Sequence, residues 1–156
     1  MPVYHSKFNA PGDPPPSFHP ELLQAAGPII QVQLEAPPAL VKVLVASGKP
    51  APKPVVGPAL IDTGASVSCV DSAVPAKLGV NPVGTSQLYG ATGGAPSPMY
   101  PLRVVFVGMT NWTVDFQYLV QATLSPLGYV ALLGRDVLRI TSLQYLGLTG
   151  EFVFSV

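Results

Sequence analysis

Proline is the feature of this 156-residue sequence that most restricts its fold. The proline ring fixes one backbone angle and removes the N–H group that helices and sheet ladders require, so a dense run of prolines blocks both structures. We therefore predict a flexible or polyproline-like arm over residues 1–28 and a folded domain over residues 29–156. The prolines of this arm are Pro2, Pro11, Pro14, Pro15, Pro16, Pro20 and Pro28.

From Ile29 onward, apolar and polar residues alternate, and this period of two predicts half-buried strands. The proline-rich segment from Ser47 to Pro58 cannot pair with a strand and predicts a long hairpin loop. The fold class is therefore expected to be mainly β. The predicted strands cover residues 29–35, 41–45, 57–70 with an interruption at 62–64, 87–89, 100–107, 113–120, 130–133 and 151–156.

Two short helices and one glycine-rich hairpin complete the prediction. Residues 71–78 begin with a capping residue and are followed by Gly79, although Pro75 limits this helix to about two turns. The second helix is predicted over residues 135–140. The glycines within residues 90–94 permit the positive φ angles of a hairpin tip, so we expect a mobile β-hairpin there.

The interruption at residues 62–64 is the first candidate site. Residues 59–66 read ALIDTGAS, which places Asp62 at the end of an apolar strand, before a hydroxyl residue, a glycine and two small residues. A charge in this setting must be solvated, paired or hydrogen-bonded, and the small residues leave room for backbone amides, water or a ligand. Asp62 is thus a candidate reactive carboxylate, and the alternative is a turn residue that caps its own backbone.

A second motif gives this candidate its context. Residues 131–138 read ALLGRDVL, two apolar residues, a glycine and then Arg-Asp at the start of a short helix. Together with Asp62-Thr63-Gly64-Ala65, this segment resembles the signatures of the retropepsins, the peptidases of retroviruses and their cellular relatives. The order of the predicted elements from Ile29 to Val156 is also similar to the layout of that family, and the arm lies outside it.

The resemblance implies a closed, mostly antiparallel β barrel with one or two short helices, paired as a two-fold homodimer. It implies that Asp62 is the one catalytic carboxylate of each subunit and faces its twin across the dimer axis, with a water between them. Two carboxyls this close share a proton, so one acts as base and the other as acid in the hydrolysis of a protein or peptide substrate. The rate is then expected to peak below neutral pH.

Other residues receive supporting roles from the same resemblance. Thr63 would hydrogen-bond across the dimer interface, and Gly64 would supply unhindered backbone for the turn and the substrate. The glycine-rich hairpin resembles the flap that closes over bound peptide in this family. The residues expected to contact the substrate are Ala65, Tyr89, Gly90, Gly93 and Gly94.

The sequence departs from the family pattern beside Arg135. This residue resembles a helix arginine that commonly pairs with an acidic residue shortly after Asp-Thr-Gly-Ala, yet Ser66 stands at that position. Arg135 must therefore find another partner. Arg135 and Asp136 are interpreted as structural, because an Asp suits the start of a helix and Arg readily makes internal pairs.

Charge and cysteine content limit the partners. Eight basic and eight acidic residues give no net charge, so neither nucleic acid nor membrane is expected as a partner. The single cysteine, Cys69, and the two histidines, His5 and His19, offer no metal cluster, and no cofactor is expected. Without a recognisable secretory signal, we expect a cytoplasmic protein.

Assembly follows from the single Asp-Thr-Gly, since a site that needs two carboxylates must take the second from another chain. The apolar, β-forming residues 151–156 are a candidate for an intersubunit sheet. The main rival function keeps the retropepsin fold as a catalytically silent dimerisation or peptide-binding domain. A more distant one is an aspartyl-phosphate phosphotransferase, for which Asp71, Asp115 and Asp136 lack the metal-binding spacing.

Overall fold

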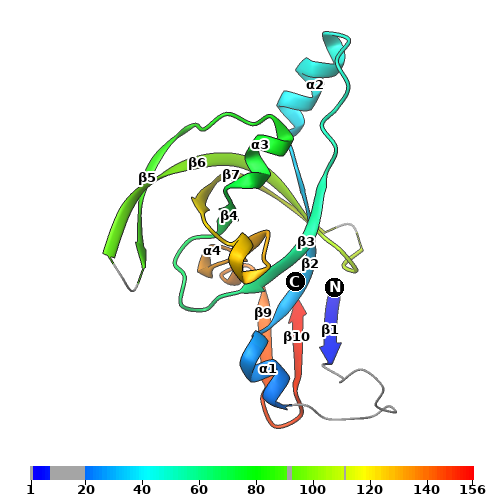
Figure 1. Cartoon of the computed structure of the whole chain (residues 1–156). Helices are drawn as coiled ribbons and strands as arrows, with labels where there is room; N and C mark the ends of the chain where they lie inside the picture. The colour runs from blue at the N-terminus through cyan, green and yellow to red at the C-terminus, as the bar shows by residue number, and fades with distance from the viewer. Residues whose placement is uncertain (1, 8–19, 91–92, 111) are drawn as a thin grey trace.

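The computed structural model describes residues 2–7, 20–90, 93–110 and 112–156 of the chain. Strands dominate these residues and build two sheets, one of seven strands and one of three. Figure 1 shows the larger sheet curving through the upper part of the molecule and the smaller one below it. The prediction of a mainly β fold is confirmed.

Six strands of the larger sheet are joined in a ring. Their order is β2, β3, β8, β4, β7, β6, and a further pairing between β6 and β2 connects the two ends. The pairs β3–β8 and β4–β7 are parallel, and the others in the ring are antiparallel. The strands are β2 (Ile29–Glu35), β3 (Val55–Ile61), β4 (Cys69–Asp71), β6 (Gly93–Phe106), β7 (Thr113–Ala122) and β8 (Ala131–Leu133).

A long hairpin extends from one side of this ring (Figure 1). Strand β5 (Gly84–Gly90) pairs antiparallel with the first half of β6, from Gly84 opposite Met99 to Gly90 opposite Gly93. The predicted glycine-rich hairpin is therefore present. The two residues at its tip, 91 and 92, lie outside the described residues, and the expected mobility of the hairpin stays a prediction.

The smaller sheet contains both ends of the chain. Strand β10 (Glu151–Ser155) lies between β1 (Val3–Lys7) and β9 (Ser142–Leu146), and both pairings are antiparallel. Residues 151–156 were predicted as an edge that could pair with a second subunit. Within the chain, β10 is paired on both sides and offers no free edge, and an intersubunit sheet stays a prediction. The outer strands β1 and β9 carry the edges instead.

The prediction of an arm without regular structure is wrong for two segments of residues 1–28. Residues 3–7 form β1, and α1 (Pro20–Ala26) is a helix. The prolines flank these elements rather than interrupt them: Pro20 opens α1, where its missing N–H is not needed. Leu23 of α1 has no exposed surface, so this helix is part of the core.

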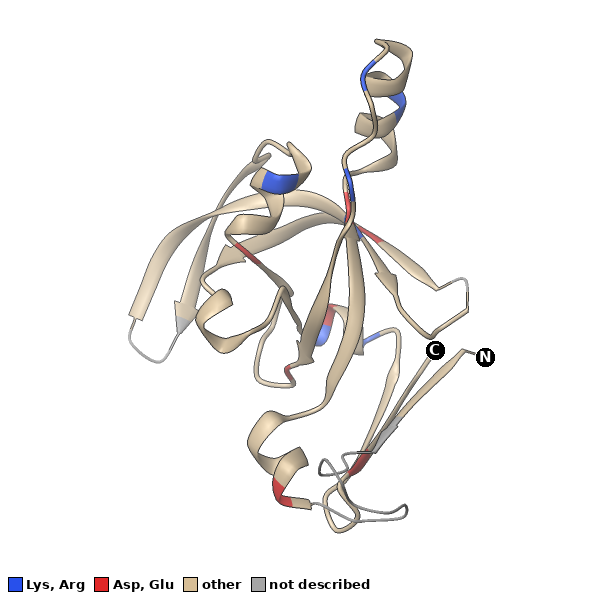
Figure 2. Cartoon of the chain, turned by 45° about the vertical axis from the view of Figure 1, so that its right-hand side comes forward, with Lys and Arg blue, Asp and Glu red and all other residues tan. Residues whose placement is uncertain are grey.

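The prediction of a strand over residues 41–45 is also wrong, because this segment belongs to the helix α2 (Pro38–Ala46). Pro38 suits the first turn of a helix, and the segment that follows is apolar except for Lys42, so the alternating valines did not mark one strand face. No residue of α2 is buried. Figure 2 shows α2 projecting away from both sheets, with its lysine in blue.

Both predicted short helices are confirmed. Helix α3 (Ala73–Leu78) ends at Gly79, which adopts a φ of 64° that side chains rarely tolerate. Helix α4 (Arg135–Leu138) follows β8 directly. A single 3-10 turn, η1 (Ser125–Leu127), connects β7 to β8.

The core fills the ring and continues into the smaller sheet. In β2, alternate residues Ile30, Val32 and Leu34 are buried, as their period of two predicted. Phe106 of β6 stacks on Phe154 of β10 with ring centroids 6.0 Å apart. Aromatic contacts of this kind join the two sheets into one apolar core.

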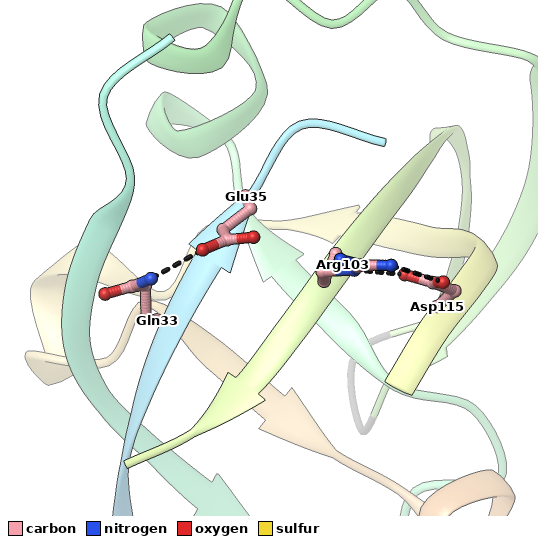
Figure 3. Close-up of polar contacts among 4 residues, drawn as sticks. All are labelled: Gln33, Glu35, Arg103 and Asp115. Carbon is pink, nitrogen blue, oxygen red and sulfur yellow. Dashed lines mark hydrogen bonds and ion pairs between the residues drawn. The ribbon is translucent and has the colours of Figure 1, made fainter. Parts of the chain in front are cut away.

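The outer face of the ring is polar where β2, β6 and β7 lie side by side (Figure 3). Arg103 donates two hydrogen bonds to Asp115, from Nε at 2.7 Å and from Nη2 at 2.9 Å. On β2, Gln33 donates a hydrogen bond to Glu35. These side chains are at least partly exposed to solvent, so their contribution to stability is small.

Candidate active site

Asp62 follows β3 at the point where that strand leaves the ring. Its backbone N–H donates to the carbonyl of Leu133 at 2.9 Å, which continues the parallel pairing of β3 with β8. The carboxylate is half-buried, and its Oδ1 accepts a hydrogen bond from the N–H of Gly64 at 2.8 Å. A Cβ on Gly64 would lie 3.1 Å from the same oxygen, so glycine suits this close approach.

Arg135 at the start of α4 holds the loop that carries Asp62. Its Nη1 donates to the carbonyl of Thr63 at 2.9 Å and to that of Gly64 at 3.0 Å. The N–H of Arg135 also donates to the carbonyl of Ala65 at 2.9 Å. The missing acidic partner is therefore replaced by backbone carbonyls of the candidate catalytic loop.

Asp136 holds the other end of the same loop. Its carboxylate accepts from the N–H of Ser68 at 2.9 Å and from the Ser68 hydroxyl at 2.6 Å. The same hydroxyl accepts a hydrogen bond from the N–H of Gly134 at 3.0 Å. Ser68 is buried, so this small network satisfies polar groups that would be costly to leave unpaired.

A cleft of about 520 Å³ opens in front of Asp62. Its floor includes residues 64–67, and the β5–β6 hairpin forms the opposite wall. Asp62 is the one charged residue among those described that line it. The lining residues are Asp62, Gly64, Ala65, Ser66, Val67, Cys69, Gln87, Leu88, Tyr89, Gly93, Ala122 and Leu132.

The hairpin presents an aromatic residue at this cleft. Tyr89 is 78% exposed and lies opposite Gly94 on the neighbouring strand. A Cβ on Gly94 would lie 2.7 Å from the tyrosine ring, so the ring covers the glycine backbone closely. A glycine at this position leaves room for the ring on the neighbouring strand.

The structure brings together most of the residues predicted for the site. Five of them line the cleft: Asp62, Gly64, Ala65, Tyr89 and Gly93. The other three lie beside it: Thr63 is in the loop after Asp62, and Gly90 and Gly94 are in the hairpin strands. Their predicted roles stay predictions.

Several lining residues were not predicted. Gln87 and Leu88 precede Tyr89 on β5, and Leu132 belongs to the second motif, so neighbourhood in the sequence was a usable signal for these three. Ala122 comes from the end of β7, and nothing in its local sequence marks it.

Cys69 lies at the back of the cleft and is buried. Burial, together with the negative charges of Asp136 and Asp62, raises the pKa of its thiol to about 11. At neutral pH the thiol is therefore protonated and a poor nucleophile. Cys69 is therefore suited to packing rather than to nucleophilic attack.

Two features, a metal cluster and a membrane-spanning helix, are absent from the described part of the chain. No group of three or more His, Cys, Asp or Glu side chains is placed there to hold a metal ion. Among the helices of the same residues, none is long and apolar enough to cross a membrane.

A family model described as retroviral aspartyl protease matches residues 24–145, which include the whole loop after Asp62, the hairpin and α4. No curated protein matches the chain.

Proposed function

The chain belongs to the retroviral aspartyl protease family, and from this premise we propose that it is an aspartic endopeptidase in which Asp62 from each of two subunits activates one water. A single observation carries the proposal. The Asp62 carboxylate is fixed by the Gly64 N–H at 2.8 Å and opens onto a cleft beneath a hairpin. A turn residue that caps its own backbone would make the same bond to Gly64, so it is the opening of the carboxylate onto the cleft that favours a reactive role.

The proposed reaction needs no covalent intermediate. Two facing Asp62 carboxyls share one proton, because both cannot ionise cheaply at short range. The ionised member takes a proton from the water as it attacks the peptide carbonyl. The protonated member gives its proton to the developing oxyanion and then helps the amine to depart.

Each chain supplies half of this site. Among the described cleft residues, Asp62 is the one carboxylate, so we propose a two-fold homodimer whose axis passes between the two Asp62 loops. We also infer that the six paired strands form the closed barrel of the family, because the β2–β6 pairing joins the ends of their order. The outer strands β1 and β9 are the available edges for a sheet between subunits.

The cleft supports an extended, uncharged substrate. Val67, Leu88, Ala122 and Leu132 give it apolar walls, and Asp62 is its one charge among the described residues. We propose that the peptide lies as an added strand between the hairpin and the loop at Asp62. Tyr89, exposed on the hairpin, would then cover the substrate.

The test compares the wild type with Asp62→Asn on a diverse peptide mixture, across roughly pH 3 to 8. New peptide termini are identified by mass spectrometry. We expect cleavage by the wild type, fastest below neutral pH, and none by Asp62→Asn, because the amide cannot act as base or share the proton. Asp115→Asn serves as the matched control, since that carboxylate lies on the outer face, far along the chain from the loop.

Two outcomes would contradict the peptidase. Equal cleavage by wild type and Asp62→Asn would remove Asp62 from the mechanism. Cleavage by neither, with both folded, would favour the silent peptide-binding or dimerisation domain. An inhibitor that carries a hydroxyl in place of the hydrated carbonyl should block the wild type.

A further inference from the structure

We propose that Arg135 is a positioning residue for Asp62, acting through the peptide group between Thr63 and Gly64. This inference rests on the proposed peptidase function and adds a residue that controls its rate. The sequence alone assigned Arg135 a structural role and left its partner open. The contacts of its guanidinium connect it to the candidate catalytic carboxylate in two steps.

The first step is the shared peptide group. Arg135 Nη1 donates to the Thr63 carbonyl at 2.9 Å. That carbonyl and the N–H of Gly64 belong to one planar peptide group, so fixing the oxygen also fixes the direction of the N–H. This N–H donates to Asp62 Oδ1 at 2.8 Å. The guanidinium therefore sets the orientation of the donor that holds the carboxylate.

Charge adds to this geometry. A cation at a carbonyl oxygen polarises the peptide group and makes its N–H a stronger donor. Arg135 also donates to the Gly64 carbonyl at 3.0 Å, which orients the next peptide group. The N–H of that group belongs to Ala65 and donates to the Asp62 carbonyl at 3.3 Å. The N–H groups of both peptide groups donate to Asp62, and the Arg135 side chain holds the carbonyl oxygens of both.

The backbone places Arg135 independently of these side-chain bonds. A Cβ on Gly134 would lie 2.8 Å from the carbonyl carbon and oxygen of Val67, so α4 begins in close contact with the loop. The Arg135 N–H donates to the Ala65 carbonyl at 2.9 Å. Replacing the guanidinium therefore removes the bonds to Thr63 and Gly64 while the helix stays in place.

Asp136 provides a contrast within the same helix. Its carboxylate binds Ser68 at the far end of the loop, and no bond links it to the peptide groups next to Asp62. Substitution of Asp136 should lower stability more than turnover. Arg139, one turn further along, is exposed, and its side chain makes no hydrogen bond or ion pair with the described residues, so Arg139→Gln is the matched control.

The experiment compares Arg135→Gln, Arg135→Lys and Arg139→Gln with the wild type. Active sites are titrated with a hydroxyl-bearing transition-state mimic, and kcat and KM are measured on a peptide that the wild type cleaves. We expect Arg135→Gln to lower kcat per titrated site by roughly tenfold to one hundredfold, with KM changed less than about twofold. Arg135→Lys should recover part of the loss because it keeps the charge, and Arg139→Gln should match the wild type.

A second measurement needs no substrate. Amide hydrogen exchange followed by NMR should be faster at Gly64 and Ala65 in Arg135→Gln and unchanged there in Arg139→Gln. Unchanged kcat per titrated site together with unchanged exchange would overturn the proposal. A loss of titratable sites with normal kcat in those that remain would also overturn it, since that outcome reports folding alone. If the wild type cleaves no peptide, the peptidase assignment fails and the exchange comparison decides this inference by itself.

Discussion

At the scale of single residues, the chain places two aspartates in opposite settings. Asp62 faces a cleft, and its carboxylate accepts one hydrogen bond from a backbone N–H. Asp71 is 3% exposed, and its carboxylate accepts several. Asp71 Oδ1 accepts from the N–H of Ala73 at 3.0 Å, and Oδ2 accepts from those of Leu124 and Ser125 at 2.9 and 2.7 Å. Asp71 therefore joins β4 and α3 to the turn after β7.

These contacts give Asp71 a defined pH dependence. Burial by itself would raise the pKa of Asp71, but the three backbone N–H groups outweigh burial and hold the pKa below its ordinary value. The folded pKa is then lower than the unfolded one, so ionised Asp71 stabilises the fold at pH values above the unfolded pKa, about 4. This contribution is lost as the pH falls through the folded pKa.

Asp71→Asn should therefore lower the free energy of unfolding at neutral pH by about 1–3 kcal/mol, because the amide leaves buried donors poorly paired. The difference from the wild type should shrink as the pH falls below about 4. Urea unfolding at several pH values measures both effects. Asp115→Asn is the exposed counterpart: Arg103 also lowers the pKa of Asp115, but that pair is exposed to solvent, so its effect should be much smaller. A difference between wild type and Asp71→Asn that does not change with pH would contradict this account.

Cys69 gives a second prediction at this scale. Because the pKa of its thiol is raised to about 11 by burial and by neighbouring carboxylates, little thiolate exists near neutral pH. Alkylation of the folded protein by iodoacetamide should be slow and should become fast in urea, as followed by intact mass. Rapid labelling of the folded chain would show that the back of the cleft is open to reagents.

The sequence predicts candidate site residues where a local motif marks them. It does not predict contacts between residues that are far apart in the chain. Asp62, Thr63 and Gly64 are adjacent, so their grouping was readable. Ser68 and Asp136 are 68 residues apart, and no local pattern links their hydrogen bonds. The partners of Arg135 could not be predicted for a related reason. They are backbone carbonyls, which every residue has, so no residue type marks them.

At the scale of elements, the predictions held where several signals agreed. The strand pattern of β2, the glycines of the β5–β6 hairpin and the glycine stop of α3 each matched the structure. The errors fall in β1, α1 and α2, where a single signal determined the prediction, and in β9, which was not predicted. A proline is tolerated at the first turn of a helix, as in α1 and α2, and the three alternating valines of α2 lie among leucines after such a start.

Helix α1 offers the test of whether the N-terminal residues belong to the folded domain. Leu23 has no exposed surface and lies in the core with β2 and β10 residues. Leu23→Ala should lower the free energy of unfolding by about 2–5 kcal/mol, as expected for a buried leucine truncated to alanine. Gln24→Ala, at the exposed next position, is the control and should change it by less than about 0.5 kcal/mol. If urea unfolding showed equally small effects for Leu23→Ala and Gln24→Ala, the N-terminal residues would be an arm outside the folded domain.

For the whole molecule, the arrangement of the two sheets could not be predicted from the sequence. The ring depends on the pairing of β2 with β6, whose partners Val32 and Phe106 are distant in the chain. The placement of β10 between β1 and β9 likewise depends on contacts between opposite ends of the chain. Periodicity finds strands, but it does not say which strands become neighbours.

One Asp62 per chain leaves a water-activating pair incomplete, so the proposed activity depends on the assembly of two chains. If the site is shared by two subunits, Asp62→Asn should inhibit the wild type when the two are mixed and allowed to exchange subunits. Random pairing at equal amounts should reduce the activity per wild-type chain to about half, and a threefold excess of the variant to about one quarter, since only dimers of two wild-type chains are competent. Asp115→Asn keeps Asp62, so mixing it with the wild type in the same way should leave the activity per chain unchanged. Sedimentation at assay concentrations must show dimers in every mixture. If added Asp62→Asn leaves the wild-type rate untouched although mixed dimers form, each chain works alone and the two-subunit mechanism is wrong.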